Sequence, residues 1–180
     1  METATLASGC FWCTEALFKR LNGVESVMSG YAGGKTENPS YEQVSSEQTG
    51  HAEAIQITFD PSVIPYEKIL EVFWKTHDPT TINQQGADIG SQYRSAIFYH
   101  SEEQRKLAET SKETTQAMFD DPIVTEIVPF KSFYEAEGYH QDFYKNNPQN
   151  GYCKLVIDPK ITKLMKNFKK EIKPEYGSAE

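Results

Sequence analysis

The chain has 180 residues, of which 38% are hydrophobic and three are cysteines; this fits one domain with a sizeable core and excludes a secreted scaffold pinned by several disulfides. Acidic residues outnumber basic ones by 26 to 18, and the resulting net charge of −8 argues against nucleic acid as the main partner, because such a surface repels phosphate backbones. No basic, apolar leader opens the chain and no apolar run approaches the ~20 residues that span a bilayer, so we expect a cytoplasmic protein without a membrane partner.

The first half of the chain combines short apolar runs with two amphipathic stretches. In chain order, this pattern predicts a strand over residues 4–7, a helix over 11–21, strands over 24–31 and 52–59, and a helix over 66–74. A polar loop over residues 77–92 follows. Loops longer than ~12–15 residues inside a compact domain are usually functional, so we expect part of a site here.

The second half begins with a predicted strand over residues 95–99 and a helix from the capping box at 101–104 to about residue 118. A strand over residues 123–128 follows, and then a helical face formed by Ala136, Tyr139, His140, Phe143 and Tyr144. Strands and helices do not alternate regularly, which indicates an α+β fold rather than a doubly wound parallel sheet.

The end of the chain differs in charge from the rest. Residues 154–180 hold seven lysines against four acidic residues, a net charge of +3. We therefore expect the chain to consist of a domain over residues 1–157 and a basic amphipathic helix and tail over residues 158–180. We expect this helix to pack on the acidic body, and a membrane-surface or partner helix is the alternative.

Cys10 follows a short predicted strand and Gly9, and it opens the first helix. The unpaired N–H groups and the positive dipole end at a helix start favour a thiolate, the reactive form of cysteine. The alternative is a small buried hydrophobic residue, which many free cysteines are. Position alone leaves both interpretations open.

Two further cysteines accompany Cys10. Cys13 completes a Cys-x-x-Cys pair, which can be a redox dithiol or half of a zinc site. The histidines stand singly and offer no second ligand pair, so zinc is disfavoured. Cys153 lies among turn-forming residues, where it is either a resolving thiol on a mobile segment or an incidental thiol in a poorly ordered tail.

Glu53 shares one face of its predicted strand with Ile55, Ile57 and Phe59. A carboxyl group on a buried face holds its proton to a higher pH, which suits a general acid. Because Glu53 lies near the end of the strand, it can instead lean toward solvent or pair with a cation. For several other candidates, packing or an ordinary loop position is the default interpretation: Phe11, Trp12, Tyr31, Tyr41, Asp88, Tyr93 and His140.

Eight short blocks resemble, in the same order, the A-type peptide methionine sulfoxide reductases. They cover roughly residues 4–157 and are Gly9-Cys10-Phe11-Trp12, Gly30-Tyr31-Ala32-Gly33-Gly34, Asn38-Pro39-Ser40-Tyr41, Thr49-Gly50-His51-Ala52-Glu53-Ala54, His77-Asp78-Pro79-Thr80, Gln92-Tyr93-Arg94-Ser95, Phe133-Tyr134-Glu135-Ala136-Glu137 and Tyr139-His140-Gln141. The resemblance implies a two-layer α+β fold of the ferredoxin-like plait type, with a mixed sheet and a long, partly irregular C-terminal segment. It also implies reduction of methionine-(S)-sulfoxide, free or in proteins, as a form of protein repair in the oxidative stress response.

The resemblance also assigns roles by position. Cys10 would attack the sulfoxide sulfur and Glu53 would protonate the sulfoxide oxygen. The residues that would bind the substrate are Phe11 and Trp12 as an apolar wall, Tyr41 and Tyr93 as hydrogen-bond donors, and Asp88 beside them. These roles agree with a Cys10 pKa lowered at a helix start and a Glu53 pKa raised by burial.

After reduction, Cys10 would be left as a sulfenic acid that a second thiol converts to a disulfide, and thioredoxin or a similar dithiol would reduce that disulfide. The resemblance favours Cys153 as the second thiol. Cys13 departs from the glycine of many family members and is the other candidate. The family implies no metal or organic cofactor, and we expect a monomer. The rival interpretation is a general thiol-disulfide oxidoreductase that uses Cys10 and Cys13.

Overall fold

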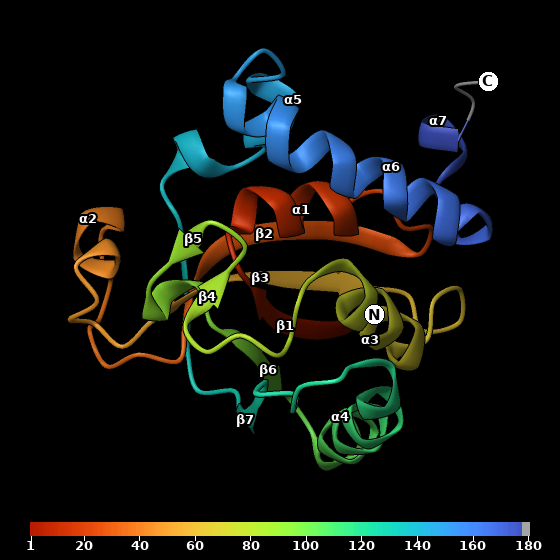
Figure 1. Cartoon of the computed structure of the whole chain (residues 1–180), viewed down its shortest axis with the longest axis horizontal. Coiled ribbons are helices and arrows are strands. Elements are labelled where there is room, and N and C mark those ends of the chain that lie inside the picture. Colours follow the sequence, from red (N-terminus) through yellow and green to blue (C-terminus); the bar gives the residue numbers. More distant parts are fainter. Residues whose placement is uncertain (178–180) are drawn as a thin grey trace.

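The computed structural model describes residues 1–177, so the last three residues of the predicted tail lie outside the described part of the chain. One sheet has the strand order β7-β6-β1-β3-β2-β8 (Figure 1). Its members are β1 (Glu2–Ser8), β2 (Val24–Ala32), β3 (Ala52–Phe59), β6 (Ser95–Tyr99), β7 (Glu126–Pro129) and β8 (Phe133–Glu135). All neighbours run antiparallel except β6 and β7, so the sheet is mixed.

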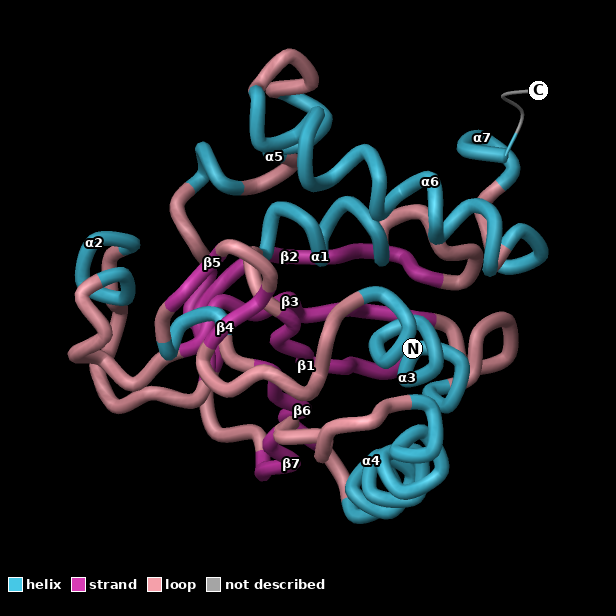
Figure 2. The backbone as a smooth tube through the Cα atoms, in the orientation of Figure 1, coloured by secondary structure: helices cyan, strands magenta, loops and turns pink. Residues whose placement is uncertain are grey.

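The helices that position the site are α1 (Phe11–Phe18) and α3 (Tyr66–Thr76), which pack against the same face of the sheet (Figure 2). They share one core with Ile55 and Ile57 of β3. The opposite face carries small residues, including Ala52 and Ala54, and a second cluster covers it. β3 is therefore buried on both faces near its start. The mixture of strands and helices confirms the α+β class expected from the sequence.

The remaining elements surround this centre. They are α2 (Tyr41–Ser45), the hairpin β4 (Gln84–Gln85) and β5 (Asp88–Ile89), the helices α4 (Glu102–Thr115), α5 (Phe143–Asn146), α6 (Asp158–Asn167) and α7 (Pro174–Gly177), and several single 3-10 turns. The predicted loop over residues 77–92 thus contains a small hairpin. None of the helices within residues 1–177 has the length and apolar character needed to cross a membrane.

The prediction of one continuous helix from Ala136 to Tyr144 is wrong. The segment forms a 3-10 turn at Gly138–His140 and then the short α5. Asp142 separates them in a left-handed conformation with φ of 53°. Since a continuous helix needs negative φ at every residue, Asp142 divides the segment into two turns that face in different directions.

The C-terminal segment is partly irregular, as expected, but its residues 151–167 are helical. A π-helical segment, Cys153–Ile157, continues directly into α6. Ile157 and Leu164 are buried and anchor this helix on the body of the protein. Cys153 is therefore a buried helical residue, so it lies neither on a mobile segment nor in a poorly ordered tail.

Candidate active site

The three cysteines come together in one buried apolar cluster, and all three are free thiols. Cys10 is 9% exposed, Cys13 is 2% exposed and Cys153 is fully buried. Cys10 caps the start of α1, where Gly9 has φ of +98°. A Cβ atom at Gly9 would lie 2.7 Å from the side chain of Gln85, so only glycine fits this turn before the cysteine.

The thiols differ in their tendency to ionise. Burial raises the pKa of Cys10 well above its usual range, and this outweighs the hydrogen bond from the Trp12 N–H at the helix start. The lowered pKa predicted for Cys10 is therefore wrong. A hydrogen bond from Cys10, supported by Lys160 and Tyr152, instead lowers the pKa of Cys13 to about 7. Burial also raises the pKa of Cys153.

Glu53 supplies the buried carboxyl group of the site. Its side chain is buried among the core residues of β3, with only 2% of the residue exposed. Its Oε1 atom accepts a hydrogen bond of 3.1 Å from the Phe11 N–H, the first amide of α1. Burial raises the pKa of Glu53 to about 8, although this hydrogen bond lowers it. Of the two orientations that the sequence left open, the structure has the buried one, and the carboxyl group is mainly protonated at neutral pH.

Tyr41 and Tyr93 bring two phenol groups to the same place. Tyr41 begins α2, which is capped by Ser40, and Tyr93 ends the 3-10 turn after the β4–β5 hairpin. Burial and the nearby Glu53 carboxyl raise the pKa of both phenols. Both hydroxyl groups therefore remain protonated and can donate hydrogen bonds to an oxygen beside Glu53.

Phe11 and Trp12 form an apolar wall at the start of α1. The Trp12 ring stacks on Phe143 with a centroid distance of 3.6 Å. Its Nε1–H donates a hydrogen bond of 3.0 Å to Nδ1 of His140. The His140 ring also lies 5.1 Å from the Phe11 ring. His140, which the sequence interpreted as a core residue by default, is thus buried within the wall of the site.

Asp88 lies on the β4–β5 hairpin and reaches the cysteines through Tyr152. Its Oδ2 atom accepts a hydrogen bond of 2.7 Å from the Tyr152 hydroxyl. The same hydroxyl lies 3.6 Å from Sγ of Cys13. Tyr152 was not predicted as a site residue from the sequence. Its position next to Cys153 was the one feature of the sequence that could have indicated it.

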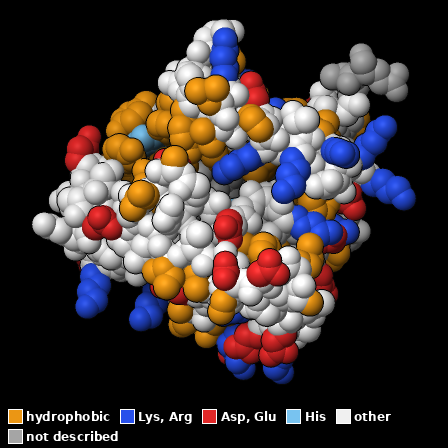
Figure 3. All heavy atoms as spheres, viewed as in Figure 1, with side chains coloured by type: hydrophobic (Ala, Val, Ile, Leu, Met, Phe, Trp, Pro, Cys, Tyr) orange, Lys and Arg blue, Asp and Glu red, His pale blue; other side chains and the backbone are white. Residues whose placement is uncertain are grey.

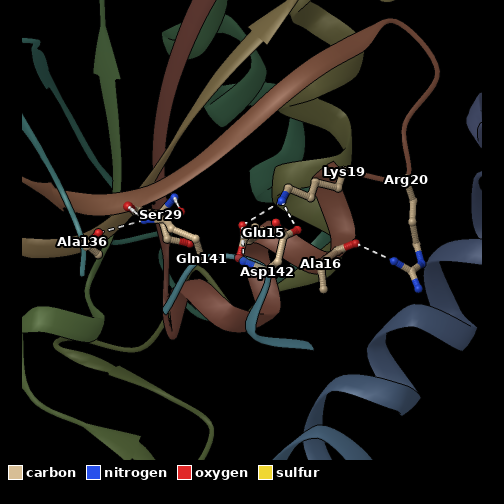
Figure 4. Close-up of polar contacts among 8 residues, drawn as sticks. All are labelled: Glu15, Ala16, Lys19, Arg20, Ser29, Ala136, Gln141 and Asp142. Carbon is tan, nitrogen blue, oxygen red and sulfur yellow. Dashed lines mark hydrogen bonds and ion pairs between the residues drawn. The ribbon is translucent and has the colours of Figure 1, made fainter. Parts of the chain in front are cut away.

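A group of polar contacts fastens the wall segment, residues 136–146, to the rest of the site (Figure 4). Glu15 of α1 accepts a hydrogen bond of 3.0 Å from the Asp142 N–H, and Lys19 forms ion pairs with both Glu15 and Asp142. Gln141 accepts a hydrogen bond from the Ser29 N–H at 3.0 Å and donates one to the Ser29 carbonyl at 2.8 Å. We call these residues, Glu15, Lys19, Ser29, Gln141 and Asp142, the polar clamp. It holds His140 and Phe143 against Trp12.

This arrangement combines a buried thiol, a buried carboxyl group, two phenol donors and an apolar wall. It can bind a small group that is apolar on one side and carries an oxygen on the other. Within residues 1–177, no group of three or more His, Cys, Asp or Glu side chains could hold a metal ion. The structure brings together every site residue proposed from the sequence: Cys10, Phe11, Trp12, Cys13, Tyr41, Glu53, Asp88, Tyr93 and Cys153.

Known proteins share this sequence and fold. A family model described as "Peptide methionine sulfoxide reductase" matches residues 2–172. A peptide methionine sulfoxide reductase MsrA of Sulfolobus acidocaldarius is 61% identical over 93% of this chain and 96% of its own length. The structure is similar to that of reduced Mxr1 from Saccharomyces cerevisiae, with a TM-score of 0.78, 39% identity, and coverage of 84% of this chain and 88% of Mxr1.

Mxr1 has also been solved in complex with Trx2, and that chain matches with a TM-score of 0.56 and 29% identity, covering 79% of this chain and 84% of its own length. The sequence similarity to the Sulfolobus protein extends over nearly the whole length of both chains. The structural similarity to Mxr1 covers most of both chains. The chain belongs to the peptide methionine sulfoxide reductase family.

Proposed function

We propose that this protein reduces methionine-(S)-sulfoxide, free or in proteins, to methionine, and that thioredoxin or a similar dithiol recycles it. The observation that carries this proposal is a buried thiol, Cys10, placed beside a carboxyl group, Glu53, that keeps its proton near neutral pH. Family membership supports the reaction. The complex of the related Mxr1 with Trx2 supports the recycling partner.

In the first stage, the methyl and thioether groups of the substrate lie against Phe11 and Trp12. Glu53 gives its proton to the sulfoxide oxygen, to which Tyr41 and Tyr93 donate hydrogen bonds. The Cys10 sulfur attacks the substrate sulfur as its own proton passes to Cys13, the thiol whose pKa is about 7. The oxygen ends on Cys10 as a sulfenic acid, methionine leaves, and Cys10 has lost the two electrons that the substrate gained.

In the second stage, we propose that Cys13 condenses with the sulfenic acid of Cys10, which forms a disulfide and releases water. Cys153 then attacks the Cys13 sulfur, which frees Cys10 and leaves a Cys13–Cys153 disulfide for thioredoxin. This order is supported by the common cluster of the three cysteines and by the pKa of Cys13, which is about 7 and makes it the most readily ionised of the three thiols. It places Cys13 before Cys153, whereas the sequence favoured Cys153 as the direct partner of Cys10.

The order of the thiols is tested by one turnover without reductant, followed by disulfide mapping with mass spectrometry. The wild type should end with Cys13–Cys153, Cys153→Ser with Cys10–Cys13, and Cys13→Ser with a sulfenic acid on Cys10. Each variant should release one methionine per enzyme, and Cys13→Ser should do so more slowly because it lacks the acceptor for the Cys10 proton. The opposite result is a Cys10–Cys153 disulfide in Cys13→Ser. If this disulfide forms as fast as the wild-type disulfide does, Cys153 reacts directly with Cys10.

The reaction itself is tested with separate S and R epimers of a methionine sulfoxide peptide and a thioredoxin system. The wild type should reduce the S epimer, and Cys10→Ser should release no methionine. Cys153→Ser is the matched control, since it removes a thiol of the same cluster but keeps the first stage. Turnover in Cys10→Ser would refute the role of Cys10. Disulfide exchange without any sulfoxide reduction would favour a general thiol-disulfide oxidoreductase.

We also propose that the fold is a ferredoxin-like plait. Its supporting feature is the chain order β1-α1-β2-β3-α3-β6 together with the strand order β6-β1-β3-β2. The division at residue 157, the cytoplasmic location and the monomeric state stay predictions from the sequence.

A further inference from the structure

His140 carries a buried polar atom that the site does not yet explain. The residue is 1% exposed, and burial lowers the pKa of its ring, so the ring is neutral at pH 7. The indole N–H of Trp12 is a donor only, so Nδ1 of His140 must accept that bond and the ring proton must be on Nε2. Among the described residues, this Nε2–H has no hydrogen-bond partner.

An unpaired buried donor lowers the stability of a folded protein, and nearly all such groups have a hydrogen-bond partner. The segment that carries His140 is held in place by hydrogen bonds and ion pairs. The polar clamp holds the neighbouring Gln141 and Asp142 against β2 and α1 (Figure 4). The chain therefore fixes the ring in a place where its buried Nε2 atom lacks a partner among the described residues.

The ring contacts Phe11, Trp12 and Tyr41, three of the residues proposed to bind the substrate. Ring centroids of Tyr139, Tyr41 and Phe11 lie 4.2, 4.7 and 5.1 Å from that of His140. Nε2 lies on the edge of the imidazole away from Nδ1 and its Trp12 partner. Figure 3 shows hydrophobic side chains gathered on the molecular surface beside α5, which follows this turn in the chain.

A methionine sulfoxide residue presents two kinds of acceptor to such a site. Its sulfoxide oxygen is taken by Glu53, Tyr41 and Tyr93 in the proposed reaction. The remaining acceptor close to the side chain is the main-chain carbonyl oxygen of the same residue. An N–H donor can pair with this carbonyl oxygen but not with the main-chain N–H.

We propose that Nε2–H of His140 binds the main-chain carbonyl oxygen of the methionine sulfoxide residue in peptide substrates. This inference rests on the proposed function and adds a contact for the peptide itself, away from the reacting sulfur. It makes His140 a residue that favours methionine sulfoxide within a polypeptide over smaller sulfoxides.

Two substrates and two variants test this contact. The substrates are N-acetyl-methionine-(S)-sulfoxide methylamide and the matching epimer of N-acetyl-3-(methylsulfinyl)propylamine, which lacks the main-chain carbonyl. His140→Asn keeps an acceptor near Trp12 and removes the outer donor. His140→Gln keeps a donor near the Nε2 position and removes the acceptor for Trp12. Ser29→Ala is the control, since Ser29 joins the polar clamp only through its main chain and its Oγ is another buried atom without a partner among the described residues.

The measured quantity is the ratio of kcat/KM for the carbonyl-bearing substrate to kcat/KM for the analogue. Wild type, Ser29→Ala and His140→Gln should prefer the carbonyl-bearing substrate by ~10-fold, a usual gain from one hydrogen bond. In His140→Asn the preference should fall to about one, mainly through KM. Circular dichroism should show that every variant is folded.

Three results would overturn the inference. The first is a wild type that does not distinguish the two substrates, which needs no variant to fold. The second is an undiminished preference in His140→Asn. The third is a loss in His140→Gln alone, which would show that His140 acts by positioning Trp12. If the wild type reduces neither sulfoxide, the proposed function fails instead.

Discussion

At the scale of single residues, burial decides the protonation of the site. Cys10 and Glu53 are both buried, and burial is the main cause that raises the pKa of each, so the resting pair is a thiol and a carboxylic acid. In the proposed reaction, the protonated Glu53 donates to the sulfoxide oxygen and the Cys10 proton passes to Cys13, whose pKa is about 7. The same low-dielectric surroundings thus prepare both partners of the reaction.

The first prediction concerns the pH dependence of activity. Because the pKa of Glu53 is about 8, kcat/KM should fall as the pH rises through this value and the acid loses its proton. Glu53→Gln keeps a hydrogen-bond donor and should remain partly active without this fall. Glu53→Ala should lose roughly 10²–10⁴-fold in rate. Initial rates on the S epimer from pH 6 to 9.5 check this, and equal rates in all three proteins would refute the acid role.

The second prediction concerns stability and the same carboxyl group. Its pKa is raised from 4.5 to about 8 on folding, so the folded state binds the proton more tightly. The free energy of unfolding of the wild type should therefore decrease between pH 4.5 and 8. Its difference from the free energy of unfolding of Glu53→Gln should change by up to about 1.4 kcal/mol per pH unit. Urea unfolding at pH 5, 7 and 9 measures this. The exposed Glu25→Gln should show no such divergence, and a parallel course of wild type and Glu53→Gln would contradict the raised pKa.

At the scale of elements, the π-helical segment Cys153–Ile157 sets the direction of the third thiol. A π-helical turn holds one residue more than an α-helical turn, and such turns occur often at functional sites. Leu155 is 80% exposed and contributes little to the core. The extra residue thus changes where Cys153 points without changing how α6 packs.

The third prediction follows from this geometry. Deletion of Leu155 should turn the segment into a regular α-helix and rotate Cys153 by roughly 100° relative to α6. Release of one methionine per enzyme should persist, whereas turnover with thioredoxin should fall at least ~10-fold, as a misplaced reacting group does. Leu155→Ala is the control and should recycle normally. Normal thioredoxin-dependent turnover in the deletion variant would show that the π-helical turn is not needed.

At the scale of the whole molecule, the C-terminal helix is part of the main core. Leu164, Phe168 and Ile172 belong to the same buried cluster as the residues of β3 and α3. Backbone hydrogen bonds also join the end of the chain to the turn after α1: the Asn22 N–H donates to the Glu171 carbonyl at 2.7 Å. The segment after residue 157 therefore supports the helix that carries Cys10 and Cys13 (Figure 1).

The fourth prediction tests this shared core. Phe168→Ala should lower the free energy of unfolding by about 3–5 kcal/mol, the usual cost of removing a buried phenyl ring. Near-UV and far-UV circular dichroism should report one common transition, because the ring packs on the core of the whole domain. The exposed neighbour Lys169→Ala should change little. A separate, early transition would show that the C-terminal segment unfolds on its own.

Local patterns in the sequence were sufficient for much of the fold. The alternation from Ala52 to Phe59 predicted β3 with its observed bounds, and it placed Glu53 on the face of Ile55 and Ile57. The start of α1 at Phe11 was also predicted, and with it the position of Cys10 as its cap. These features depend on neighbours in sequence, so periodicity and capping signals reveal them.

The remaining features depend on groups that are distant in sequence. Side chains from other segments decide three of these features: the pKa of Cys10, the burial of Cys153 and the unpaired Nε2 atom of His140. Asp142 interrupts a helix that periodicity favours, because Glu15 and Lys19 of α1 hold it in place. The sequence by itself thus determined the class of fold, the family resemblance and the set of candidate residues. Only the tertiary structure decided which groups of the site hold their protons and that the three thiols lie in one cluster, because burial and charge act through space.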